Sequence, residues 1–184
     1  DAEDLLSQVL TTALEIGEQQ RITPVRLALI EHHYLREQWD PAHTHLEAML
    51  TFGTRVLRPW DAGAVRLWAS RLRVNVSDDV GSRPTEAQRL ELAGDPAAAA
   101  AELDRRHLPF DAAMCRLAGA RAGHPQLLSR AAEGFDRLGC IAGADAARRL
   151  AAGQGLKLGR RSTERGRQRA APAHPLGLTR KEVE

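Results

Sequence analysis

The stretch LELAGDPAAAAAELDRRHLPFDAAMCRLAGA, residues 90–120, contains the pattern that decides the fold. Gly94 is expected to end one helix in the left-handed conformation, and Asp95 and Pro96 are expected to open the next helix as its cap and its first residue. A connection this short joins helices that are antiparallel neighbours. The stretch therefore predicts a hairpin of two helices that approach closely through small alanine side chains.

Composition extends this prediction to the rest of the chain. The 184 residues include 31 alanines, 25 leucines and 24 arginines, but only three phenylalanines and one tyrosine. These abundant residues favour helices, and the β-branched and aromatic residues that strands need are scarce. We therefore expect an all-α fold of about nine helices, stacked as antiparallel hairpins in a tetratricopeptide-like repeat array. A compact helical bundle would use the same pattern and is the alternative.

Three residue pairs predict where further helices begin, because a proline in the first turn of a helix costs no intrahelical hydrogen bond. The pairs are Thr23–Pro24, Asp40–Pro41 and Arg58–Pro59. Trp39, Trp60 and Trp68 lie on or beside these helices. We interpret them as anchors of the core and as packing at the hairpin corners, rather than as a cage for a ligand.

Charge divides the chain into a body and a basic tail. Residues 154–184 contain eight basic and three acidic side chains, a net charge of +5, which leaves −3 for residues 1–153 because the whole chain carries +2. We predict a helical-repeat domain over 1–153, a flexible basic linker over 154–177 and a truncated first helix of a further domain over 178–184. The chain does not begin with methionine, so we expect it to be a piece of a longer polypeptide.

The candidate chemistry of the body is thin. His32, His33, His43 and His45 could gather around one hairpin, and neutral imidazole is a good zinc ligand. Neighbouring residues point about 100° apart on a helix, so few of these rings are expected to converge, and no metal site is predicted. The sequence has no glycine-rich phosphate loop and no catalytic constellation. We expect neither a cofactor in this segment nor enzymatic activity.

The two cysteines and the hydropathy pattern indicate the environment of the protein. Cys115 and Cys140 are too few for a disulfide framework, and no base lies near either in the sequence, so both are predicted to be inert packed thiols. No apolar run is long enough for a membrane span or a secretory signal. We expect a cytoplasmic protein with no membrane partner.

Two motifs near the C-terminus resemble the LuxR family of transcription regulators. His174–Val183, HPLGLTRKEV, resembles the start of the LuxR-type DNA-binding helix-turn-helix, and Thr179 with Glu182 also has the spacing of a capping box. Gly159–Thr163, GRRST, resembles the run that precedes this domain in large ATP-binding members. Upstream, Leu92–Ala100, Pro109–Ala113 and Phe135–Gly139 are similar to the tetratricopeptide-like helices of those regulators.

The resemblance implies a helical sensor and interaction segment that relays a signal to a C-terminal helix-turn-helix. DNA would bind the missing C-terminal domain, a protein or peptide would bind the helical array, and ATP would bind an upstream module that this segment lacks. Non-specific phosphate contacts could come from five linker residues, Arg160, Arg161, Arg165, Arg167 and Arg169. The alternative is a stand-alone helical scaffold that binds a protein or peptide and has no connection with DNA.

Overall fold

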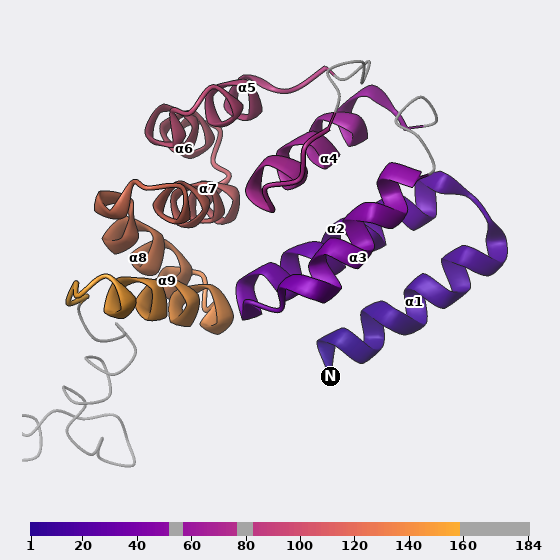
Figure 1. Ribbon diagram of the computed structural model, residues 1–184, viewed down its shortest axis with the longest axis horizontal. Helices are drawn as coiled ribbons and strands as arrows, with labels where there is room; N and C mark the ends of the chain where they lie inside the picture. The colour runs from indigo at the N-terminus through magenta and orange to yellow at the C-terminus, as the bar shows by residue number, and fades with distance from the viewer. Residues whose placement is uncertain (52–56, 77–82, 159–184) are drawn as a thin grey trace, which may run out of the picture.

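The computed structural model describes residues 1–51, 57–76 and 83–158 (Figure 1). These residues form nine α-helices and no strand. The helices are α1 (Ala2–Ile16), α2 (Gln19–Arg36), α3 (Trp39–Thr51), α4 (Pro59–Arg71), α5 (Glu86–Leu92), α6 (Pro96–Arg105), α7 (Pro109–Arg121), α8 (Leu128–Arg137) and α9 (Ile141–Gly153), with a short 3₁₀ helix, η2 (Pro125–Leu127), before α8. The predicted all-α array of about nine helices is confirmed.

Most of the helical hairpins share one backbone joint. Gly94 ends α5 in the left-handed conformation, with φ of 86°, as predicted. Its N–H donates to the carbonyl of Glu91, and the N–H of Asp95 donates to the carbonyl of Leu90, which satisfies two carbonyls at the end of the helix. The same pair of hydrogen bonds follows Glu37, Arg73, His107, Gly123, Gly139 and Gly155. This repeated joint turns the chain back sharply after α2 and after each of α5 to α8, and so shapes most of the array. The end of α1 differs, because the Gly17 N–H donates to the carbonyl of Ala13.

The residue pairs that contain proline predict two helix starts correctly and two incorrectly. Asp95 caps α6 and Pro59 is the first residue of α4, as expected. The prediction that Thr23 caps the second helix is wrong, because α1 ends at Ile16, Gly17 caps it, and α2 already begins at Gln19. Pro24 therefore lies inside α2. The cause is the left-handed conformation of Gly17, which turns the chain before Thr23 is reached.

The second proline pair shows a smaller difference. The third helix begins at Trp39 rather than after Asp40, so Pro41 is its third residue. The first N–H groups of a helix have no intrahelical partner, and a proline at this position still removes no hydrogen bond. The pairs Asp40–Pro41 and Asp95–Pro96 thus resemble each other in sequence but lie at different positions in their helices.

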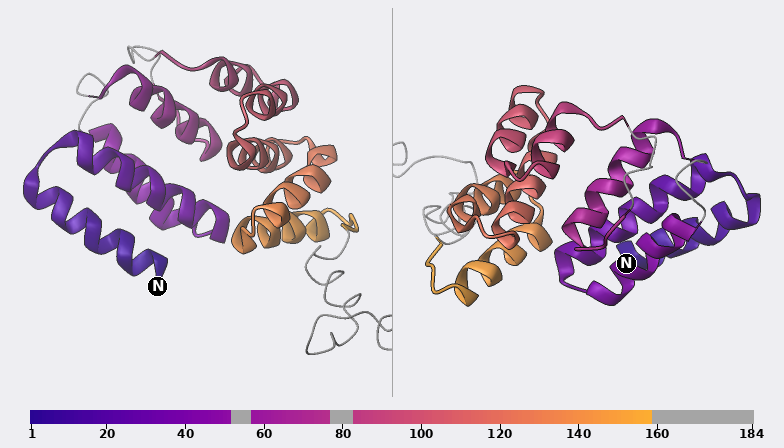
Figure 2. Two further views of the ribbon diagram at one scale, coloured as in Figure 1. Left: turned by 180° about the vertical axis from the view of Figure 1, so that it is seen from behind. Right: turned by 45° about the horizontal axis from the view of Figure 1, so that its top comes forward.

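The array curves until its last helix meets its second (Figures 1 and 2). Consecutive helices pack on one another, and α9 also contacts α2, beside the C-terminal end of that helix. One hydrophobic core therefore draws residues from α2 to α4 and from α7 to α9, among them Ile30, Leu46, Trp68, Leu117, Phe135 and Ala147. The contact between α9 and α2 closes the curve and creates the pocket described below.

The tryptophans do not share one environment. Trp68 is buried, as predicted, and its ring packs edge-to-face on Tyr34 with 5.2 Å between centroids. Trp39 stands at the hairpin corner between α2 and α3, and 41% of its surface is exposed, so it is not a core anchor. As the first residue of α3, it stands at the rim of the array, where the α2 to α3 turn leaves one side of the indole uncovered. The side chain of Trp60 lies outside the described residues.

The C-terminal boundary of the helical body lies at α9. This helix ends at Gly153, and residues 154–158 continue without regular structure while Leu158 packs against the core. The remaining linker, its five arginines and the predicted start of the helix-turn-helix, residues 159–184, lie outside the described residues. Among the described helices, none combines the length and the apolar character that crossing a bilayer would require.

Candidate functional site

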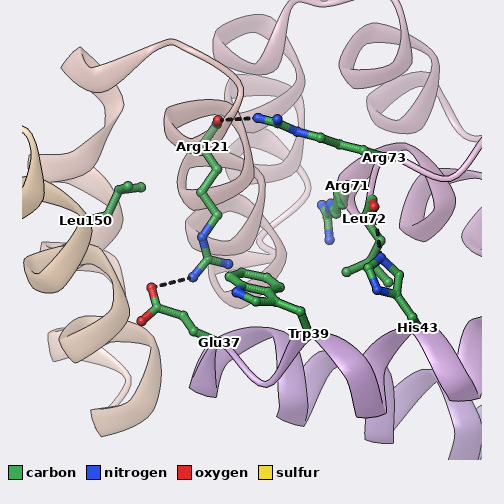
Figure 3. Close-up of a pocket in the computed structure, with 8 residues that line it drawn as sticks. All are labelled: Glu37, Trp39, His43, Arg71, Leu72, Arg73, Arg121 and Leu150. Carbon is green, nitrogen blue, oxygen red and sulfur yellow. Dashed lines mark hydrogen bonds and ion pairs between the residues drawn. The ribbon is translucent and has the colours of Figure 1, made fainter.

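A cavity of about 350 Å³ opens where the C-terminal ends of α2, α4 and α7 meet α3 and α9 (Figure 3). We call it the Trp39 pocket. Its lining residues are Glu37, Trp39, His43, Arg71, Leu72, Arg73, Arg121 and Leu150. The curvature of the array brings these residues together, because they come from five different helices or helix ends.

Arg121 is the central cation of the Trp39 pocket. Its guanidinium donates to the carbonyl of Tyr34 at 3.2 Å and to Oε1 of Glu37 at 3.2 Å. The same group lies over the rings of Tyr34 and Trp39, at 4.2 and 4.9 Å from their centroids. Arg121 therefore donates a hydrogen bond to a backbone carbonyl at the C-terminal end of α2. The same guanidinium holds the exposed indole of Trp39 in position.

Glu37 joins the two ends of the curved array. It follows α2 in the left-handed conformation, with φ of 60°. Its carboxylate accepts hydrogen bonds from Arg121 of α7 and from Nε of Arg149 of α9, the latter at 2.8 Å. One carboxylate thus serves two guanidinium groups, so this part of the pocket keeps an excess of positive charge.

The two arginines at the end of α4 differ in their partners. Arg71 forms a bidentate ion pair with Glu91, with N to O distances of 2.7 and 2.9 Å. Burial opposes its charge, but the pair with Glu91 outweighs burial and raises the pKa of Arg71. Arg73 is exposed and donates to the carbonyl of Arg121 at 3.4 Å. Within the described residues, no carboxylate forms an ion pair with Arg73, so its charge is available to a ligand.

The walls of the Trp39 pocket combine this charge with apolar surface. Leu72, Leu150 and the uncovered side of Trp39 supply the apolar part. His43 Nε2 lies 3.1 Å from the carbonyl of Leu72, which accepts, so Nε2 carries the proton. The pocket can therefore hold an anionic group next to an apolar one, and it disfavours cations.

A second cavity, of about 250 Å³, lies between α2, α4, α5, α6 and α7. Its carboxylates are Glu31, Glu91 and Asp111, and Arg71 lines both cavities. Burial and the charge of Asp111 raise the pKa of Glu31 to about 7, although Arg71 opposes this shift. Burial also raises the pKa of Asp111. This cavity holds a carboxylate that changes charge near neutral pH.

The four histidines considered in the sequence do not converge on one point. His43 lines the Trp39 pocket, and the ring of His45 stacks on that of His33 at 5.7 Å. His32 and His33 were expected to point apart, but their rings lie 5.4 Å from each other in an edge-to-face arrangement. Glu3, which the sequence analysis did not single out, lies beside His32, with its Oε2 3.4 Å from His32 Nε2.

The cysteines are both free, and they lie in different environments. Cys115 is fully buried, and its thiol lies 3.4 Å from the carbonyl of Pro96. Burial raises the pKa of this thiol, so it stays protonated at neutral pH, as the predicted inert role requires. Cys140 is partly buried and precedes α9.

Sequence reasoning missed the residues that build the Trp39 pocket. Glu37, Arg73 and Arg121 stand at helix ends. The two arginines draw no attention there, because basic residues are ordinary at the C-terminal end of a helix, and Glu37 reads as one more charged residue of a turn. Glu37 and Arg121 are 84 positions apart, and only the closure of the array brings them together. The one usable signal is that Glu37 and Arg73 occupy a joint at which glycine is the expected residue.

Comparisons of the chain with protein-family models, with curated proteins and with solved structures found no match.

Proposed function

We propose that the helical array is a non-catalytic interaction module and that a protein segment with an acidic group binds in its Trp39 pocket. The observation that carries this proposal is the combination of an exposed indole with guanidinium groups that outnumber their carboxylates. Tryptophan and arginine are among the residues enriched in the few positions that dominate binding energy at protein interfaces.

The chemistry of the Trp39 pocket suggests how such a segment binds. A carboxylate would accept hydrogen bonds from Arg73, whose charge has no acidic partner among the described residues, and from the remaining donors of Arg121. An apolar side chain beside this carboxylate would lie on Trp39 between Leu72 and Leu150. The backbone carbonyls of Tyr34, Leu72 and Arg121 already accept hydrogen bonds from side chains of the pocket. The side chains that line the pocket therefore recognise the bound segment.

We also propose that this module belongs to a cytoplasmic LuxR-type regulator and relays binding at the array to a DNA-binding domain. The support is the sequence resemblance at 159–163 and 174–183, which lies outside the described residues. A stand-alone scaffold is the other candidate, and the Trp39 pocket fits both. The coding sequence downstream of Glu184 separates them: an apolar helix and then a basic helix favour the regulator, whereas an unrelated sequence favours the scaffold.

Peptide selection tests the binding proposal. A displayed library of random peptides, selected on the full chain, should be enriched in sequences with aspartate or glutamate beside an apolar residue. For the selected peptides, Arg73→Glu and Trp39→Ala should each weaken binding by about 2 kcal/mol, or roughly 30-fold, in fluorescence anisotropy. Arg130→Glu is the matched control, because Arg130 is an exposed arginine on α8 that does not line the pocket. Enrichment of basic peptides, or binding that Arg73→Glu leaves unchanged, would overturn the proposal.

A further inference from the structure

On another side of α2, three side chains place potential metal ligands close together. Glu3 of α1 and His32 and His33 of α2 each offer one ligand atom, and these atoms lie within 4.8 Å of one another. The side chain of His32 is only 9% exposed, and His33 is buried. We propose that these three residues bind a divalent transition-metal ion of the Zn²⁺ class and thereby fasten α1 to α2. The site uses no residue of the Trp39 pocket.

The first support is an unsatisfied nitrogen. His32 Nε2 is buried and has no hydrogen-bond partner in the described part of the chain. The nearest carboxylate oxygen, Glu3 Oε2, lies at 3.4 Å, which is longer than an ordinary N–H to O hydrogen bond. Two ligands of a tetrahedral ion with bonds of about 2.0–2.1 Å stand about 3.3 Å apart. The separation of this pair therefore suits two ligands of one ion better than a direct hydrogen bond.

The second support is the orientation of His33. Its Nδ1 lies 2.9 Å from Oε1 of Gln38, an oxygen that can only accept, so Nδ1 carries the proton. Nε2 is then left with a free lone pair. Metal-binding histidines usually donate their other N–H to a carbonyl or carboxylate in this way. The ring of His45, stacked on His33 with an interplanar angle of 8°, adds a second constraint on its orientation.

The donor set indicates the class of ion. Two imidazole nitrogens and one carboxylate suit zinc and neighbouring transition metals, whereas Mg²⁺ and Ca²⁺ prefer oxygen ligands alone. Glu3 is 42% exposed, so an ion can enter from solvent and keep a water molecule as its fourth ligand. Zn²⁺ is therefore the probe of choice.

Arg36 competes with the ion in the present arrangement. Its NH1 lies 3.2 Å from His32 Nδ1, and a guanidinium can only donate, so Nδ1 accepts and the proton of the neutral ring stands on Nε2. Coordination through Nε2 requires the other tautomer, and Arg36 must then move away. This movement is easy, because Arg36 is exposed and forms no ion pair with a described residue.

A bound ion would have a clear structural effect. Ala13 is the only residue of α1 that is buried, and α1 packs mainly on α2. Glu3 lies in the first turn of α1, whereas His32 and His33 lie in the last turns of α2. An ion held by all three would tie down the end of α1 that is farthest from the Gly17 turn.

Isothermal titration calorimetry of the metal-free full chain with Zn²⁺ tests the proposal. Gln38→Leu should weaken binding by about 10- to 100-fold, as loss of an outer hydrogen-bond partner usually does, and Glu3→Gln and His32→Gln should weaken it at least as much. Arg36→Gln should strengthen it, a result that a purely structural role for these residues does not predict. Glu15→Gln and His124→Gln are matched controls elsewhere in the chain and should leave the affinity unchanged.

Hydrogen exchange gives a readout that is independent of affinity. Zn²⁺ should slow amide exchange in the first turns of α1 in the wild-type chain but not in Glu3→Gln. Glu3 is not buried, with 42% of its side chain exposed, so this variant keeps the test valid even if His32→Gln fails to fold. Equal Zn²⁺ affinity in the wild type and Glu3→Gln, or unchanged exchange in α1 with saturating Zn²⁺, would overturn the proposal.

Discussion

Replacing Glu31 with glutamine should change how the stability of the protein depends on pH. Glu31 lies on α2 in the second cavity, where burial and the nearby charge of Asp111 raise its pKa to about 7. In the unfolded chain the pKa returns to its ordinary value. Between these two values the folded state binds a proton that the unfolded state has released. The protonated side chain therefore stabilises the fold at low pH, and this stabilisation is lost as pH rises through about 7.

The shift sets the size of the effect. A change in pKa from 4.5 to about 7 corresponds to roughly 3 kcal/mol of unfolding free energy. The side chain of Glu31 is partly exposed, so water screens part of this energy. We expect the wild type to lose about 1–3 kcal/mol relative to Glu31→Gln between pH 4.5 and pH 8, with no further loss at higher pH.

Urea unfolding at a series of pH values, monitored by circular dichroism, measures this difference in the free energy of unfolding. Asp111→Asn should shrink the pH dependence of the wild type, because it removes the like charge that raises the pKa of Glu31. Glu47→Gln, which changes an exposed glutamate of α3, is the control and should leave the profile as it is. If the wild type and Glu31→Gln kept a constant difference in stability across this range, the raised pKa would be refuted.

Three further predictions test the packing and the tail. A Cβ at Gly143 would lie 2.5 Å from the Phe135 ring, so Gly143→Ala should lower the free energy of unfolding by about 1–3 kcal/mol. On the same helix, a Cβ at Gly153 would meet no atom within 4 Å, so Gly153→Ala should raise it by up to about 1 kcal/mol. Trp68→Ala should cost about 3–5 kcal/mol in urea unfolding, and an unchanged midpoint would contradict its burial. The full chain should bind duplex DNA without sequence preference, with a slope of log affinity against log salt of roughly −3 to −4.5, and deletion of residues 159–184 should abolish this binding while leaving the helical spectrum intact.

The fold was predictable where local chemistry decides it. Gly94, Asp95 and Pro96 determine their joint through backbone conformation and capping alone, and the structure has that joint where the sequence predicts it. The start of α2 was not predictable in this way, because Thr23 and Pro24 carry a valid start signal that the earlier turn at Gly17 overrides. Of the two signals, the turn at Gly17 comes first along the chain, and α2 begins directly after it.

The candidate sites were much less predictable than the helices. The Trp39 pocket depends on the approach of α9 to α2, and no spacing within one helix encodes that approach. The same is true of Glu3, which reaches His32 from a different helix. Periodicity describes which side of a helix is apolar, but it does not say which other helix will face the polar residues.

The conformation of the joints adds an independent reason to connect the Trp39 pocket with function. Among the described residues, three joints place a residue other than glycine in the left-handed conformation, at Glu37, Arg73 and His107. Each costs roughly 1 kcal/mol or more relative to a glycine such as Gly94 at the same position of its own joint. Such a cost is retained where the side chain makes contacts that glycine cannot. Two of these three residues line this pocket, where Glu37 binds two arginines and Arg73 presents its charge at the rim. The contacts of Glu37 stabilise the fold itself, whereas Arg73 has no carboxylate partner among the described residues, so Arg73 is the residue of the two whose identity supports the proposal that this pocket binds an acidic group.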